Sequence, residues 1–218
     1  MLKAIATTLV LAAVAQQPSQ PEVEHYRLLK QLRRQGFTCP NGQAFPPNNG
    51  LFAFDCRVWR AAQAHSKDQA ARRYFAHVTP EGLDPCARTR NAGLQACSEN
   101  IAAGQATPRA ALDALKSSAH HCPNMMDPSL NRVGIGYASL AGSPYTHYWT
   151  QNMGNDGSAV DTSCSPPDVG ENPTNLPPTS SCRDYNPACA SFNGYAGTPS
   201  CQTEWTISQC PKACGLCK

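Results

Sequence analysis

The sequence predicts a mixed α/β domain followed by a small disulfide-rich module. Helical and strand periodicities alternate over residues 22–156, and residues 157–181 carry five prolines among small polar residues. Residues 182–218 hold six of the twelve cysteines. We therefore expect a domain with one hydrophobic core, a solvated linker, and a module that depends on its cysteines.

The composition argues against a partner that is a polyanion. The chain has 18 basic and 15 acidic residues, a formal net charge of +3, and no block of five or more like charges. No nucleic-acid partner is therefore expected. Twelve cysteines in 218 residues indicate an oxidising compartment, because cytosolic thiols are kept reduced unless they hold metal or carry out redox chemistry.

Residues 1–15 have the pattern of a secretory signal peptide. Lys3 precedes an apolar run from Ala4 to Ala15 that ends in a small-x-small cleavage pattern. The run is shorter than the roughly 20 residues that span a bilayer, and no second apolar segment follows. The mature chain is therefore expected to be secreted, without an integral membrane segment.

Two helices are predicted in the first half of the domain. A first stripe of apolar residues at helical spacing is closed by Gly36 and comprises Val23, Tyr26, Leu29 and Leu32. A longer stripe runs to about Tyr74 and comprises Leu51, Phe54, Val58, Ala62, His65 and Gln69. His65 is therefore interpreted first as a histidine at the edge of the core.

The second half predicts one more helix and two strands. Thr107 and Pro108 are an N-cap and an N1 proline, and the helix they open continues toward Ser118. A strand with alternating apolar residues and glycines covers residues 133–137, and a second strand covers residues 145–151.

Short motifs along the domain occur in a specific order. They are His65-Ser-x-Asp68, Tyr74-Phe75-x-His77, Arg88-x-x-x-Ala92-Gly93, Glu99-Asn100-Ile101-Ala102, Ser117-Ser118-Ala119-His120, Asn124-Met125-Met126, Val133-Gly134-Ile135-Gly136 and Tyr148-Trp149-Thr150-Gln151. Over about residues 22–154 this set resembles the CAP (SCP domain) superfamily of cysteine-rich secretory, antigen 5 and pathogenesis-related 1 proteins, most of all its bacterial-type branch. The resemblance implies an α-β-α sandwich with a shallow cleft.

The same resemblance implies a site in that cleft. His77 and His120 match the two family histidines and Glu99 matches the family glutamate, whereas Ser117 stands where animal and plant members have a second glutamate. Two imidazoles and a carboxylate are ligands for a divalent cation such as zinc, and we expect binding only above about pH 6, where histidine is largely neutral. A hydrogen-bonded His-Glu-His network that only ties segments together is an equal alternative.

The sequence favours one class of function and leaves two alternatives open. Some family members bind sterols or fatty acids, so a non-enzymatic extracellular binding protein is the favoured interpretation. A hydrolase or protease that uses the His-Glu site and a structural or defence-related scaffold are the alternatives. Met125, Met126 and Leu130 could line a lipid groove, but methionines at this spacing more often fill a core.

The tail from Cys182 to Cys217 resembles the ShKT domain, which is named for a potassium-channel toxin. The resemblance implies the bridges Cys182–Cys217, Cys189–Cys210 and Cys201–Cys214, one of fifteen possible pairings. The channel-blocking lysine is missing between the third and fourth cysteines, where this chain has Glu204 and Trp205, so no potent channel block is expected. The module is instead expected to contact an extracellular protein or glycan.

Six cysteines remain for the first 164 residues. Cys86 and Cys97 flank the loop that leads to Glu99, and a bridge between them would fix one side of the cleft. The other pairings stay open, with Cys39–Cys122 favoured and no assignment for Cys56 and Cys164.

Overall fold

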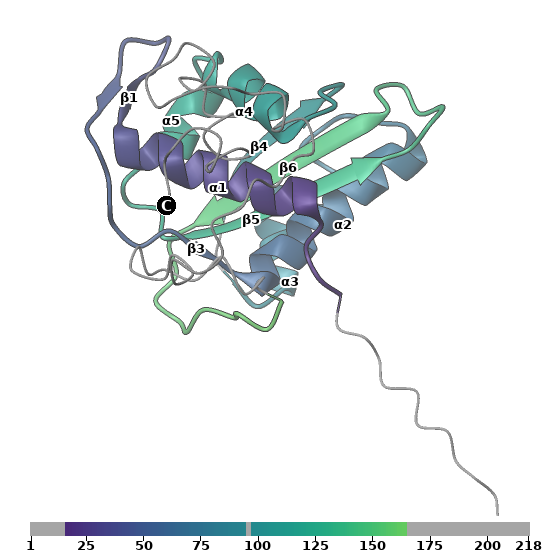
Figure 1. Ribbon diagram of the computed structural model, residues 1–218. Coiled ribbons are helices and arrows are strands. Elements are labelled where there is room, and N and C mark those ends of the chain that lie inside the picture. Colours follow the sequence, from purple (N-terminus) through teal and green to yellow (C-terminus); the bar gives the residue numbers. More distant parts are fainter. Residues whose placement is uncertain (1–15, 95–96, 165–218) are drawn as a thin grey trace, which may run out of the picture. The chain divides into compact units, whose positions relative to one another are not determined.

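A four-stranded sheet with the order β3-β5-β6-β4 forms the middle of the fold (Figure 1). The computed structural model describes residues 16–94 and 97–164, so the predicted signal peptide and the ShKT module lie outside the described residues. The strands are β3 (Ala53–Phe54), β4 (Ser98–Ala103), β5 (Arg132–Ser139) and β6 (His147–Gly154). β3 runs parallel to β5, and the other neighbours are antiparallel. β1 (Phe37–Thr38) and β2 (Ala44–Phe45) form a separate two-stranded sheet.

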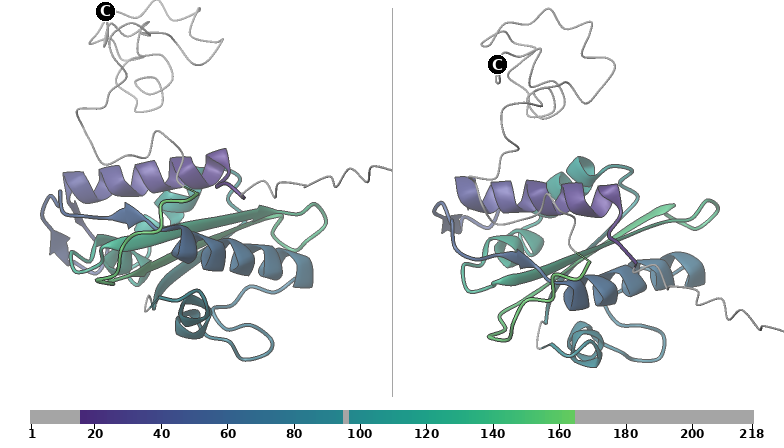
Figure 2. Two further views of the ribbon diagram at one scale, coloured as in Figure 1. Left: turned by 90° about the horizontal axis from the view of Figure 1, so that it is seen from below. Right: turned by 60° about the horizontal axis from the view of Figure 1, so that its bottom comes forward.

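Helices cover both faces of this sheet (Figure 2). On one side lie α1 (Gln20–Gln35), α4 (Pro108–Lys116) and α5 (His121–Met126); on the other lie α2 (Cys56–Arg72) and α3 (Pro85–Asn91). The domain is therefore an α-β-α sandwich, as the resemblance to the CAP superfamily implies. None of the helices in residues 16–94 and 97–164 is long and apolar enough to cross a membrane.

The glycines of β5 allow α2 to lie directly on the sheet. A Cβ atom added at Gly134 would lie 2.2 Å from the backbone nitrogen of Trp59, and one at Gly136 would lie 2.2 Å from the carbonyl oxygen of Ala62. Val133 and Ile135 alternate with these glycines and are fully buried on the opposite face. The alternation along β5 thus gives the strand two different faces. The glycine face contacts the backbone of α2, and the face with Val133 and Ile135 packs its side chains in the core.

The predicted helices agree with the structure except at the start of α2. α1 ends at Gln35 with Gly36 as its C-cap, and the Thr107 hydroxyl caps α4. The prediction that the long helix includes Leu51 and Phe54 is wrong. Phe54 belongs to β3, and the helix starts only after Asp55, whose carboxylate accepts a hydrogen bond from the backbone nitrogen of Arg57 at 3.0 Å.

The core fills the space between α1 and the sheet. Met125 and Met126 are at most 2% exposed and Leu130 is 9% exposed, and all three belong to this core. Their interpretation as core residues is confirmed, so they do not line a lipid groove. Arg33 reaches into the same region and donates hydrogen bonds to the carbonyl oxygens of Met125, at 2.7 Å, and Leu130, at 3.2 Å.

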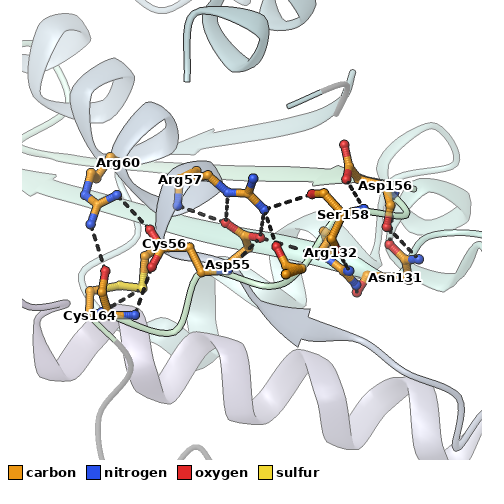
Figure 3. A network of polar contacts seen from close by, with 12 residues as sticks. Asp55, Cys56, Arg57, Arg60, Asn131, Arg132, Asp156, Ser158 and Cys164 are labelled. Atoms are coloured by element: carbon orange, nitrogen blue, oxygen red, sulfur yellow. Dashed lines mark hydrogen bonds and ion pairs between the residues drawn. A yellow bond between two sulfur atoms is a disulfide. The ribbon is translucent and has the colours of Figure 1, made fainter. Parts of the chain in front are cut away.

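Residues 155–164 are fixed to the start of α2 by polar contacts (Figure 3). Arg57 donates to the hydroxyl of Ser158 at 3.2 Å, and Arg132 donates to the Ser158 carbonyl oxygen at 2.7 Å. Arg60 forms an ion pair with Asp161, with 3.0 Å between the charged atoms. This segment follows the last strand but packs as part of the domain.

Two disulfides fix the start of α2 and the start of α5 to distant parts of the chain. Cys56 is bonded to Cys164, and Cys39 is bonded to Cys122. The prediction that residues 157–164 belong to a solvated linker is therefore wrong, because their polar groups are paired with α2 and Cys164 is only 1% exposed. The remainder of the predicted linker, residues 165–181, lies outside the described residues.

Candidate functional site

A buried carboxylate, Glu99 on β4, is the centre of the site. Its side chain is 1% exposed, and both of its oxygens have partners. Oε1 lies 2.9 Å from Nδ1 of His77, and Oε2 accepts a hydrogen bond from the guanidinium of Arg88. His77 is 46% exposed, so the imidazole connects the buried carboxylate to solvent.

Arg88 is held in place from several directions. One of its terminal nitrogens donates to the carbonyl oxygens of His77, at 2.7 Å, and Leu83, at 2.9 Å. A disulfide joins Cys86 to Cys97, two residues before Arg88 and Glu99 respectively. The covalent bond therefore ties the helix that carries the guanidinium to the strand that carries the carboxylate.

His65 lies beneath this pair as a neutral core residue. Its Nε2 atom is 3.0 Å from the carbonyl oxygen of Ala76 and 4.0 Å from Oε1 of Glu99. Burial lowers the pKa of His65 to about 4, although the nearby Glu99 carboxylate opposes the shift. At neutral pH the ring is therefore uncharged and donates its Nε2 hydrogen to the Ala76 carbonyl.

A second histidine near His77 comes from α5, and it is His121. Burial lowers the pKa of His121, and the proximity of His77 and then of His120 lowers it further. The carbonyl oxygen of His121 also accepts a hydrogen bond from Asn100 at 3.1 Å, directly next to Glu99 on β4. His120, the sequence-based assignment, is the exposed N-cap residue of α5.

The helical register of α5 is the signal that the sequence analysis missed. Asn124, three residues after His121, donates to the side-chain oxygen of Asn100 at 3.0 Å. Residues three apart share a helix face, so His121 and Asn124 both lie toward β4. Ser117 has a local structural contact instead. It is the exposed C-cap residue of α4, and its hydroxyl donates to the carbonyl oxygen of Asp113 at 2.8 Å.

The side chains do not fit the expected metal site. Within residues 16–94 and 97–164, no group of three or more His, Cys, Asp and Glu side chains is arranged so that it could hold a metal ion. The expected set of His77, Glu99 and His120 is thus not brought together as ligands. Instead the Glu99 carboxylate is shared between His77 and a fixed cation, Arg88.

Exposed apolar residues gather on two segments, one of which contains His77. The exposed large hydrophobic residues among those described are six in number, and five of them lie on residues 75–83 or 140–145: Phe75, Val78, Leu83, Leu140 and Tyr145. We call these five the apolar rim. The rings of Phe75 and Tyr145 are in contact, with 5.6 Å between centroids, and Arg73 donates to the carbonyl oxygen of Gly142 at 2.9 Å. The two segments are therefore joined.

Two proteins of the genus Bacillus are similar to part of this chain. The uncharacterized protein YkwD of Bacillus subtilis (strain 168) is 33% identical over 96 residues, which are 43% of this chain and 35% of that protein. An extracellular protein containing a SCP domain from Bacillus anthracis str. Ames is 27% identical with a TM-score of 0.43, over 49% of this chain and 34% of that one. This chain therefore spans about a third of the length of both relatives.

A third comparison concerns the fold alone. An outer surface protein from Borrelia burgdorferi is 12% identical with a TM-score of 0.51, over 63% of this chain and 95% of that one. The family model described as "CAP: Cysteine-rich secretory protein family" matches residues 30–153, more than half of the 218 residues. The chain belongs to this CAP family of cysteine-rich secretory proteins.

Proposed function

We propose that this protein is secreted and that its CAP domain binds an amphipathic lipid, a sterol or a fatty acid, without catalysing a reaction. The apolar rim is the observation that carries the proposal. Single exposed hydrophobic residues are ordinary, but five on two joined segments mark a binding surface. The three disulfides within the described residues suit an extracellular location.

His77 supplies the polar contact that such a ligand needs. It lies between Phe75 and Val78 in the sequence, and its contact with Glu99 uses only Nδ1 of the ring. The Nε2 edge of the half-exposed imidazole is then available to the hydroxyl of a sterol or the carboxylate of a fatty acid. A lipid bound here would place its apolar body on the rim and its polar end at His77.

Extraction of labelled lipid from vesicles tests this proposal, with a sterol in one arm and a long-chain fatty acid in the other. The double variant Phe75→Ser/Tyr145→Ser should lose at least about tenfold in affinity, because it removes the ring contact at the centre of the rim. Failure of the unaltered protein to extract either lipid, or extraction by the double variant at the same level, would contradict the proposal.

Leu51 offers a matched control. It is the sixth exposed large hydrophobic residue, at 48%, but it precedes β3, which pairs with the first two residues of β5. The rim residue Leu140 instead follows the last residue of β5, at the opposite end of the strand. Leu51→Ser removes a comparable apolar surface and should leave lipid extraction unchanged.

Hydrolysis is the second candidate, and the contact between His77 and Glu99 favours it. A carboxylate that orients an exposed imidazole is an arrangement used for general base catalysis. In that case His77→Gln would abolish ester hydrolysis. Equal hydrolysis by His77→Gln and the unaltered protein would dismiss this candidate.

The predicted C-terminal module would add a second contact. If residues 182–218 form an ShKT domain, its binding to an extracellular protein or glycan would keep the lipid-binding domain at one location. Adhesion of the full chain to matrix, lost on removal of residues 182–218, is the expected result. Unchanged adhesion after that truncation would show that the module does not attach the protein to the matrix.

A further inference from the structure

We propose that Arg88 takes the place of a divalent cation in this domain, so that the site is charge-balanced without metal. The starting point is the burial of Glu99, whose side chain is 1% exposed. A carboxylate removed from water needs a compensating charge or hydrogen bonds. In this structure a side chain of the same protein provides both.

Arg88 provides Glu99 with a permanent compensating positive charge. His65 is neutral at physiological pH, and its Nε2 is 4.0 Å from the carboxylate and directed at the Ala76 carbonyl. His77 contributes a hydrogen bond through Nδ1 at 2.9 Å. A guanidinium stays charged at any physiological pH, so Arg88 neutralises the carboxylate permanently.

The position of Arg88 is built into the fold. Its side chain is 9% exposed, and it donates to two backbone carbonyl oxygens in addition to Glu99. The Cys86–Cys97 disulfide fixes the backbone on both sides of the ion pair. Moving the guanidinium aside for a metal ion would break both of these hydrogen bonds as well as the ion pair with Glu99.

The charge of Arg88 also opposes metal binding directly. A divalent ion at Glu99 would lie within a few ångströms of a fixed positive charge in a poorly screened environment. Removal of that charge should therefore allow Glu99 and His77, whose side chains are already in contact, to bind a divalent ion together with water molecules. A gain of zinc binding on loss of an arginine is a result that a simple structural ion pair does not predict.

The test compares zinc binding by the full chain and by Arg88→Met. Titration calorimetry and thermal unfolding should show no zinc site at Glu99 in the unaltered protein. Arg88→Met should unfold at a lower temperature, recover part of the loss with zinc, and bind zinc at least about tenfold more tightly. The added replacement His77→Ala should remove that gain.

Arg90→Met is the matched control, since Arg90 is exposed on the same helix. It should change neither the unfolding temperature nor the response to zinc. If Arg88→Met does not fold, Arg88→Gln keeps an amide donor for the backbone carbonyls while it removes the charge. Zinc binding by the unaltered protein that Glu99→Gln abolishes, or no gain in the neutral variants, would overturn the proposal.

Discussion

Cys56, the first residue of α2, is bonded to Cys164, which follows it by 108 residues. The bond closes a single loop that contains every element from α2 to β6. Replacement of both cysteines by alanine should lower the free energy of unfolding by about 2–4 kcal/mol, because the unfolded chain regains the freedom of this loop. Urea unfolding under non-reducing conditions measures the loss.

The Cys86–Cys97 pair is the comparison for this prediction. It is separated by only 11 residues, and the entropy of loop closure grows with the logarithm of loop length. Its removal should therefore cost about 2 kcal/mol less than removal of the long bridge. An equal or larger loss for the short bridge would contradict the loop-closure account and would point to its support of the Arg88–Glu99 ion pair.

The contact between β5 and α2 predicts a severe effect of one added methyl group. Gly136→Ala places a Cβ atom 2.2 Å from the carbonyl oxygen of Ala62, so the helix has to move away from the sheet. We expect a loss of about 1–3 kcal/mol in the free energy of unfolding. Gly157→Ala is the control because a Cβ there meets nothing within 4 Å, and it should leave stability unchanged.

Two buried histidines predict that acid destabilises the fold. Burial lowers the pKa of His25 to about 3 and that of His65 to about 4, from an ordinary value of 6.5. The unfolded chain therefore binds more protons than the folded one once the pH falls below 6.5, and stability decreases from there down to the folded pKa values. Above pH 6.5 both rings are neutral in both states and contribute no pH dependence.

Each ring should contribute a slope of up to about 1.4 kcal/mol per pH unit in this window. Urea unfolding at pH 7.5, 5.5 and 4.5 measures the slope. His25→Gln should flatten it. A slope that is the same in His25→Gln and the unaltered protein would rule out His25 as a source.

Asn100 joins three segments through one amide. Its nitrogen donates to the carbonyl oxygen of His121, at 3.1 Å, and to the side-chain oxygen of Gln151, at 2.9 Å, while its oxygen accepts from Asn124. Asn100→Ala removes all three of these hydrogen bonds and should cost more than about 2 kcal/mol. Asn124→Ala removes one of these bonds and should cost about 1 kcal/mol; a reversed order in thermal unfolding would contradict this.

The regular elements could be predicted where one face of an element is buried. The stripe from Val23 to Leu32 and the alternation around Ile135 describe faces that pack in the core, so their periodicity is visible in the sequence. β3 has two residues and no period of its own. Leu51 and Phe54 matched the helical spacing by coincidence, and Asp55 as an N-cap was the better boundary signal.

The candidate site could be predicted only in part, because its partners are distant in the sequence. The resemblance to the CAP family directed attention to His77 and Glu99, which the structure places in contact. The charge beside them was missed, since nothing in a short motif shows that Arg88 turns toward Glu99. The choice between His120 and His121 depended on the rotation of a six-residue helix.

The anchoring of Cys164 has a mechanical consequence. Cys164, the last described residue, is bonded to the first residue of the 17-residue α2, about 25 Å from the end of the helix that leads to Phe75. A pull on the tail is transmitted through a covalent bond into this helix, and β6 is not peeled from its neighbours. The sheet is therefore shielded from a force applied after Cys164 for as long as this disulfide stays intact.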